Sequence, residues 1–245
     1  MENTYLVADL NWHEVKTCLE QDYLAVLPIG AGCKEHGLHL PMNTDYIQAE
    51  WLSQQIARFH PALIWPIVSY GFYPTFINYP GSCSISEDTF ARTITDILQN
   101  ILAAGASRII IINTGISTIA PLENVLDSFN HQKQIILFNT YTGTHFTRAV
   151  KVIEEQNTSG HADEIETSIM LALAPDKVDM SQAGSFCGEL TAGPLNPDDP
   201  DKPNYSPHGV TGDATLATVE KGNRFIRAIL KDLAAMITKS GLESN

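Results

Sequence analysis

Residues 30–45 bring together the types of side chain that catalyse reactions or bind metal ions. Within this segment lie one lysine, two carboxylates and two imidazoles: Lys34, Glu35, His36, His39 and Asp45. The segment follows residues 24–29, an apolar run that predicts a strand covered on both faces. Because ligands of open α/β sheets bind beyond the carboxyl ends of the strands, we expect the active site here. Imidazole and carboxylate ligands suit zinc or manganese, so His36, Asp45 and Glu35 are candidate metal ligands.

A second cluster of polar residues opens a predicted helix at residues 164–173. His161 precedes this helix, and Asp163 is interpreted as an ordinary acidic cap. Glu166 is surrounded by apolar positions, which predict its burial. Since a buried carboxylate needs a partner, we expect a histidine or a metal ion beside Glu166.

A third candidate segment follows the predicted strand at residues 108–112. It contains Asn113, Gly115 and Ser117, which are turn-forming or hydroxyl-bearing residues without a strong metal ligand or base. Two interpretations remain open. The exposed backbone amides bind a substrate oxygen, or the segment only turns the chain into the next helix.

The elements that must position these clusters alternate along the chain. We predict strands at residues 24–29, 62–68, 108–112 and 134–138, and helices at 45–58, 86–104, 119–130, 164–173 and 216–238. One helix per crossover predicts a single domain, residues 1–245, built as a three-layer α/β/α sandwich with a mostly parallel sheet. Residues 184–212 contain five prolines, which exclude a helix or a central strand. We predict that this arm covers the active site or contacts another subunit.

The composition limits the class of partner. A net charge of −13 without a basic stripe argues against nucleic acid and anionic membranes as partners. No apolar run reaches the ~18 residues of a membrane span, and the first residues do not resemble a signal peptide. The four cysteines are scattered, so we expect reduced thiols and a cytoplasmic location. A small-molecule substrate is the expected partner.

These motifs, in this order and spacing, resemble the creatininase (creatinine amidohydrolase) family over nearly the full chain. The resemblance rests on Pro28-Ile-Gly30, His36-Gly-Leu-His39-Leu-Pro41, Thr44-Asp45, Pro80-Gly81, His161-Ala-Asp-Glu-Ile-Glu166 and Gly209-Val-Thr-Gly-Asp-Ala-Thr. It implies an α/β/α sandwich, a homo-oligomer that is often a hexamer, and two zinc or manganese ions that activate water against an amide. It also implies that His161 and Glu166 match the catalytic histidine and glutamate of the family.

The metal ligands that the resemblance implies are incomplete. His36 and Asp45 match, but Lys34 stands at a glutamate position, and Gly115 and Ser117 stand where a histidine and an acid are expected. Two remaining ligands cannot hold two ions, because each ion needs about three protein ligands. An ammonium group among them also repels a divalent ion by several kcal/mol at an effective dielectric near 20.

The sequence allows two other arrangements of this site. In one, Glu35 or Glu164 joins His36 and Asp45 around a single zinc or manganese ion, with His161 as a further candidate ligand. In the other, no metal is needed, because Lys34 replaces the metal charge, pairs with Asp45 and polarises a substrate carbonyl. His161 and Glu166 then act as the acid/base pair. The second arrangement is favoured, because Lys34 stands at a position where the family has a metal ligand.

The functional hypothesis is therefore a creatininase-like amidohydrolase that cleaves a C–N bond, in a cyclic or linear amide, of a small polar metabolite. The alternative is a catalytically silent family member that binds a ligand or serves as an assembly subunit. A third possibility is a lyase or isomerase in which Lys34 forms a Schiff base. Borohydride trapping of a carbonyl substrate separates this last possibility from the others.

Overall fold

The computed structural model describes residues 4–129, 135–158, 160–186, 188 and 190–241. Its central sheet has five parallel strands in the order β1-β3-β2-β4-β5. The strands are β1 (Thr4–Leu6), β2 (Leu24–Ile29), β3 (Ala62–Ile64), β4 (Ile109–Asn113) and β5 (Ile135–Asn139). Every residue of β2, β3 and β4 is buried, which is typical of parallel strands covered on both faces.

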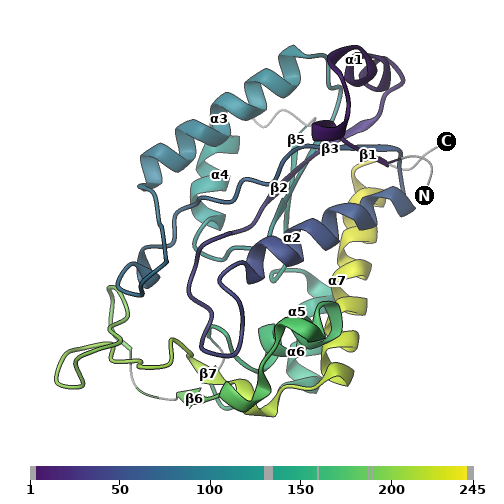
Figure 1. Cartoon of the computed structure of the whole chain (residues 1–245). Helices are drawn as coiled ribbons and strands as arrows, with labels where there is room; N and C mark the ends of the chain where they lie inside the picture. Colours follow the sequence, from purple (N-terminus) through teal and green to yellow (C-terminus); the bar gives the residue numbers. More distant parts are fainter. Residues whose placement is uncertain (1–3, 130–134, 159, 187, 189, 242–245) are drawn as a thin grey trace.

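Helices cover both faces of this sheet (Figure 1). One face carries α1 (Trp12–Glu20), α3 (Glu87–Ala103) and α4 (Ile119–Ser128), and the other carries α2 (Thr44–Gln55), α5 (Thr144–Ile153), α6 (Glu164–Leu173) and α7 (Val219–Lys239). Alternate residues of a strand point to opposite faces, so β4 contributes to two cores. Ile110 and Ile112 pack with α2 and α7, whereas Ile109 and Ile111 pack with α3 and α4. The predicted three-layer α/β/α sandwich is confirmed.

The order of the strands changes direction at β2. From β2 the chain crosses through α2 to β3 on one side, and it then crosses through α3 to β4 on the other side. The carboxyl ends of β2 and β4 therefore border the crevice where open α/β sheets bind ligands. The loop of residues 30–43 and the turn of residues 114–118 both begin at this crevice.

Several predicted boundaries need correction. The strand predicted at residues 62–68 ends at Ile64, because Pro66 has no amide hydrogen for the ladder, and only Val68 returns as an isolated bridge to Ile29. The helix predicted at 45–58 ends as a 3₁₀ turn over Ile56–Arg58. The last helix begins later than predicted, at Val219, because Thr218 caps it by accepting from the amide of Lys221.

Other predicted boundaries agree with the structure, and some elements were not predicted. The helix predicted at 164–173 is α6, capped by Asp163 as expected. The sequence did not predict β1, α1 or α5. Residues 130 and 134, the predicted helix end and strand start, lie outside the described residues. Among the described residues, no helix combines the length and the apolar character that a membrane span requires.

Candidate active site

The loops that follow β2 and β4 are joined directly at the crevice. The Thr114 hydroxyl lies within hydrogen-bond distance of the carbonyl oxygens of Ile29, at 3.2 Å, and Asp45, at 2.9 Å. The first turn of α2 is thereby attached to the ends of both strands. Gly30 permits this approach, because a Cβ atom at that position would lie 2.4 Å from the Asp45 carbonyl oxygen. The Asp45 side chain is thus held at the crevice.

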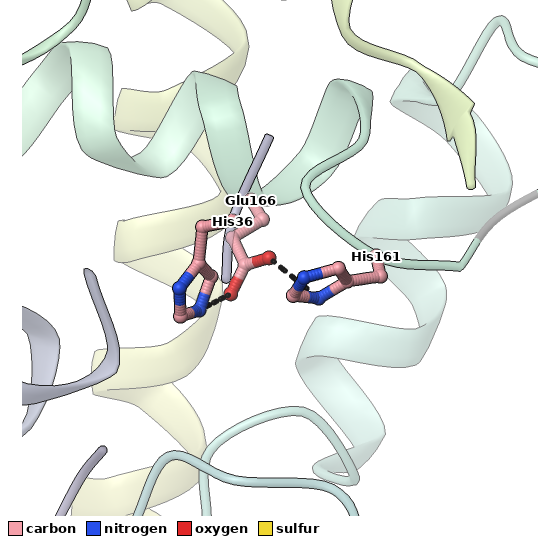
Figure 2. Close-up of side chains that lie close together, drawn as sticks. All are labelled: His36, His161 and Glu166. Atoms are coloured by element: carbon pink, nitrogen blue, oxygen red, sulfur yellow. Dashed lines mark ion pairs between the residues drawn. The ribbon is translucent and has the colours of Figure 1, made fainter. Parts of the chain in front are cut away.

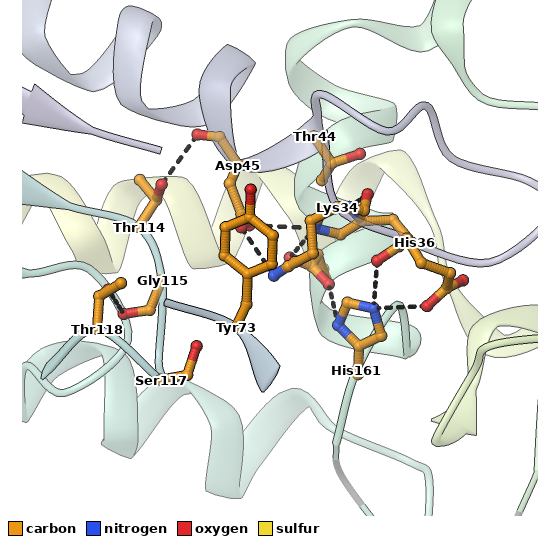
Figure 3. A network of polar contacts seen from close by, with 12 residues as sticks. Lys34, His36, Thr44, Asp45, Tyr73, Thr114, Gly115, Ser117, Thr118 and His161 are labelled. Carbon is orange, nitrogen blue, oxygen red and sulfur yellow. Dashed lines mark hydrogen bonds and ion pairs between the residues drawn. The ribbon is translucent and has the colours of Figure 1, made fainter. Parts of the chain in front are cut away.

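A buried ion pair joins Lys34 and Asp45 (Figure 3). The Nζ–Oδ2 distance is 2.7 Å, and the two side chains are 9% and 2% exposed. Burial disfavours the charged lysine, but Asp45, Glu166 and Glu35 outweigh it and raise the pKa of Lys34. Burial likewise disfavours the aspartate, but Lys34 and His36 hold the pKa of Asp45 well below its ordinary value. Lys34 is therefore an ammonium and Asp45 a carboxylate, and the pairing predicted from the sequence is confirmed.

The fully buried His36 ring is oriented by the loop that carries it. Its Nδ1 lies 2.8 Å from the carbonyl oxygen of Lys34, which can only accept, so Nδ1 carries a hydrogen. Its Nε2 lies 3.1 Å from Asp45 Oδ1 and 3.7 Å from Glu166 Oε1. Nε2 therefore faces one oxygen of each carboxylate, at a position where both negative charges would favour a bound cation.

The His161 ring is oriented in the same way from the other side of the site. Its Nε2 lies 2.7 Å from the carbonyl oxygen of Glu35, so Nε2 carries the hydrogen and Nδ1 has the lone pair. Nδ1 lies 3.7 Å from Glu166 Oε2, which also accepts from the amide of Ala162. Two acceptor atoms thus face each other beyond hydrogen-bond distance, so a water molecule or a cation between them would satisfy both.

Neighbouring segments fix the position of His161. The Phe76 ring lies 4.1 Å from the His161 ring, centroid to centroid. The backbone of His161 forms an antiparallel bridge with Thr211, through hydrogen bonds of 2.8 and 2.9 Å. Phe76 could not be identified from the sequence, because its contact with His161 joins segments that are far apart in the chain.

The donor atoms of this site fit one divalent ion. His36, His161 and Glu166 each offer one ligand atom, and these atoms lie within 4.8 Å of one another (Figure 2). Both histidines direct their other nitrogen to a backbone carbonyl, which is the usual support of a metal-binding imidazole. A second ion beside Asp45 does not fit, because the Lys34 ammonium lies 2.7 Å from that carboxylate.

Glu35 and Glu164, the acids suggested from the sequence as further ligands, are hydrogen-bonded or ion-paired to other groups. The Glu35 carboxylate accepts from the Gly37 amide and lies 3.2 Å from His161 Nε2. Burial disfavours its charge, but His161 outweighs this effect and lowers the pKa of Glu35. Glu164 is fully buried and accepts from Lys221 Nζ at 2.6 Å. Glu164 therefore connects α6 to α7 and does not face His36.

The candidate substrate-binding residues separate into two groups. The Asn113 side chain bonds to the amide and the carbonyl of Gly115, at 3.2 and 2.8 Å, so both residues are used within the turn. Ser117 lines the same cavity as Lys34 and His161, although its hydroxyl donates to the carbonyl of Phe72 at 2.8 Å. The structure thus supports the turn interpretation for Asn113 and Gly115, and their contact with a substrate stays a prediction.

A cavity of about 560 Å³ opens onto these groups. Its charged end is formed by Lys34, Asp45, His161 and Glu166. The remaining wall includes apolar side chains that the sequence did not single out: Phe76, Ile116, Phe146, Val150 and Ile165. The candidate catalytic residues and several apolar side chains therefore line one cavity at the predicted edge of the sheet.

The proline-rich arm, residues 184–212, supports this site from outside. Leu195 is buried against Tyr73, Phe76 and Tyr79, and its amide donates to the carbonyl of Thr75 at 2.8 Å. None of the described residues of the arm lines the cavity. The arm thus packs behind the segment that carries Phe76, and its predicted role as a cover or a subunit contact stays a prediction.

The chain is similar to known proteins over nearly its full length. Residues 8–237 match the family model described as creatininase, creatinine amidohydrolase. The creatinine amidohydrolase of Pseudomonas putida is 24% identical over 257 residues, with 97% of each chain covered. The 3-dehydro-scyllo-inosose hydrolase of Thermotoga maritima is also 24% identical, over 91% of this chain and 79% of the relative.

Solved structures show the same fold. A crystal structure of creatinine amidohydrolase superimposes with a TM-score of 0.78 at 22% identity, covering 96% of each chain. A manganese form of creatininase gives a TM-score of 0.76 at 22% identity, covering 96% of this chain and 98% of that chain.

Proposed function

This chain belongs to the creatininase family, and on that premise we propose that its cavity hydrolyses a C–N bond in a small amide-containing metabolite. The observation that carries the proposal is the buried Lys34–Asp45 pair beside the His161–Glu166 pair, at the charged end of one cavity. These groups supply a fixed positive charge and a base, which are the two functions that amide hydrolysis requires.

Lys34 is proposed to stabilise the negative charge that develops on the substrate carbonyl oxygen. Its ammonium lines the cavity and is held rigidly by Asp45, at 2.7 Å. A preorganised charge in a site of low dielectric needs no reorganisation during the reaction. The same pairing argues against a Schiff base, because a raised lysine pKa leaves little free amine to attack a carbonyl.

His161 is proposed as the general acid/base, and Glu166 as its positioning partner. Nδ1 of His161 is the nitrogen left free by the Glu35 carbonyl, so it can take a proton from a water molecule between it and Glu166. The water oxygen bonds to the carbonyl carbon, and the C–N bond breaks. The proton held on His161 then passes to the leaving nitrogen, which gives a carboxylic acid and an amine.

Among the described residues, His36, His161 and Glu166 form the one group that could hold a divalent ion. Relatives with this fold include a manganese form and a zinc–zinc form of creatininase, so zinc and manganese are the ions to test. Such an ion would lower the pKa of a bound water, and would thereby activate the water nucleophile in place of the base His161. The roles proposed from the sequence for Asp45 and Glu35 as ligands are weaker, because Lys34 and His161 already engage their carboxylates.

Two experiments test this function. Elemental analysis of purified protein should find no more than one zinc or manganese ion per chain, and two ions per chain would refute the loss of the dinuclear site. Purified protein should release amine from members of a panel of linear and cyclic amides. Glu166→Gln should abolish release, while Glu123→Gln, on the exposed surface of α4, should not. Ligand binding without any hydrolysis would favour the catalytically silent alternative.

Assembly and location are also proposed rather than observed. The family resemblance supports a homo-oligomer, expected to be a hexamer, and the chain's composition supports a cytoplasmic location. Light scattering of the purified protein and fractionation of cells test these two statements.

A further inference from the structure

The cavity has two chemically different parts. One group of lining residues is charged: Lys34, Asp45, His161 and Glu166. The rest of the lining is mainly apolar, with Phe76, Ile116, Phe146, Val150 and Ile165, and it includes the hydroxyl-bearing residues Thr75, Thr114, Ser117, Tyr141 and Thr147. A volume of about 560 Å³ lies within the range of roughly 300–1,000 Å³ that is typical of pockets for larger organic ligands. The amide group alone would occupy only the charged end, so the apolar wall must contact another part of the substrate.

Helices α5 and α6 provide this apolar wall. Phe146 and Val150 lie four residues apart on α5 and therefore on one side of the helix, and Ile165 from α6 lines the same cavity. Val152, two residues further along α5, is 75% exposed and does not line the cavity. Thr147 on the same side of α5 also lines the cavity, but its hydroxyl donates to the carbonyl of Gly143 at 2.9 Å. The apolar part of the lining on α5 is therefore Phe146 and Val150.

The charges around the cavity restrict what can lie along this wall. Asp163 and Glu166 also line the cavity, and Lys34 is already paired with Asp45. A negatively charged group on the substrate would meet the carboxylates of Asp163 and Glu166, and the Lys34 ammonium is already neutralised by Asp45. Four hydroxyl groups that line the cavity, those of Thr114, Ser117, Tyr141 and Thr147, already donate hydrogen bonds within the protein. Hydroxyl groups of a substrate along Phe146 and Val150 would therefore find few free donors in place of water, which disfavours a polyol at this position.

We infer that the substrate is an uncharged amide with an apolar substituent of several carbons, whose amide lies at Lys34 and whose substituent lies along Phe146, Val150 and Ile165. This inference rests on the proposed function, since it names the substrate class of the same site. The amide group of the substrate lies among the charged residues, and the apolar side chains of the cavity select its substituent.

The test uses straight-chain primary amides from propionamide to hexanamide. Ammonia release gives kcat/KM, and calorimetry on the Glu166→Gln variant gives the affinity without turnover. Each added methylene should strengthen binding and kcat/KM about fourfold, the equivalent of about 0.8 kcal/mol per buried CH₂. Val150→Ser should weaken hexanamide severalfold more than propionamide, and Val152→Ser, the matched control on α5, should leave the series unchanged.

The two proposals fail in different ways. Affinity that rises with chain length, without ammonia release from wild-type protein, supports the substrate class and refutes hydrolysis of these amides. Hydrolysis with no dependence on chain length, or with equal effects of Val150→Ser and Val152→Ser, overturns the substrate class and leaves the proposed function in place. Absence of both binding and hydrolysis across the whole series also overturns the substrate class.

Discussion

The buried pair of Lys34 and Asp45 makes a quantitative prediction about stability. Lys34→Met keeps much of the side-chain volume but leaves the Asp45 carboxylate, 1% exposed, without its closest cation. Removing one partner of a buried pair typically costs about 3–5 kcal/mol in the free energy of unfolding. We expect about 3 kcal/mol, because His36 Nε2 remains 3.1 Å from Asp45 Oδ1.

The pH dependence of this loss follows from the pKa of Asp45. In the wild type this pKa is depressed, so the stability that Asp45 contributes is present above about pH 4 and is lost only as the pH falls below it. Without Lys34, burial raises the pKa above its unfolded value. The variant's deficit should then be largest near neutral pH and should shrink as the pH falls towards 5.

Urea unfolding, followed by circular dichroism in the presence of a chelator at pH 7.5 and pH 5, measures both effects. Lys34→Met combined with Asp45→Asn removes both charges and should be more stable than Lys34→Met alone. Lys16→Met is the matched control, because Lys16 is 59% exposed and pairs with Glu20 only at 3.7 Å, so it should change stability by less than about 1 kcal/mol. A Lys34→Met deficit below about 1 kcal/mol, or one independent of pH, would refute the argument.

Three further predictions concern neighbouring residues. Lys34→Glu replaces the ammonium beside Asp45 with a carboxylate and should raise zinc or manganese content in elemental analysis; unchanged content contradicts this. Gly30→Ala should lower the free energy of unfolding by about 2 kcal/mol, because the new Cβ would lie 2.4 Å from the Asp45 carbonyl oxygen, whereas Gly184→Ala makes only ordinary contacts and serves as the control. Burial lowers the pKa of His39 to about 4, so stability should fall by about 2 kcal/mol as the pH drops from 6.5 to 4, and His39→Gln should remove that slope in pH-dependent unfolding.

The layered fold could be predicted because its signals are local. Strands β2 and β4 are apolar at every position or nearly so, and α3 begins with a capping serine followed by acids. Helix α5 was missed although its pattern was present. Phe146, Ala149, Val150 and Ile153 follow helical spacing, and applying that template to residues 144–153 would have found the helix.

The sequence predicted which residues belong to the candidate site better than it predicted which of them contact each other. The sequence placed Lys34, His36 and Asp45 in one loop after a strand, and the lysine–aspartate pair is found in the structure. The group of possible metal ligands differs in part from the one predicted. It contains Glu166 in place of Asp45 and Glu35, whereas His36 and His161 were both named from the sequence. Which carboxylates are available to bind a metal ion depends on which ones are already paired with other groups. Spacing along the chain does not predict these pairings.

The sequence by itself determined the α/β/α layers and the family, because these follow from local apolar patterns and from residue types at motif positions. The loss of the dinuclear metal site is a prediction from the same residue types. Only the tertiary structure decided how the retained groups are used. Backbone carbonyls of Lys34 and Glu35 set which nitrogens of His36 and His161 face Glu166. The strand order then brings α5 and α6 together over these groups and makes one wall of the cavity apolar. Such contacts join distant segments, so they exist only once the chain has folded.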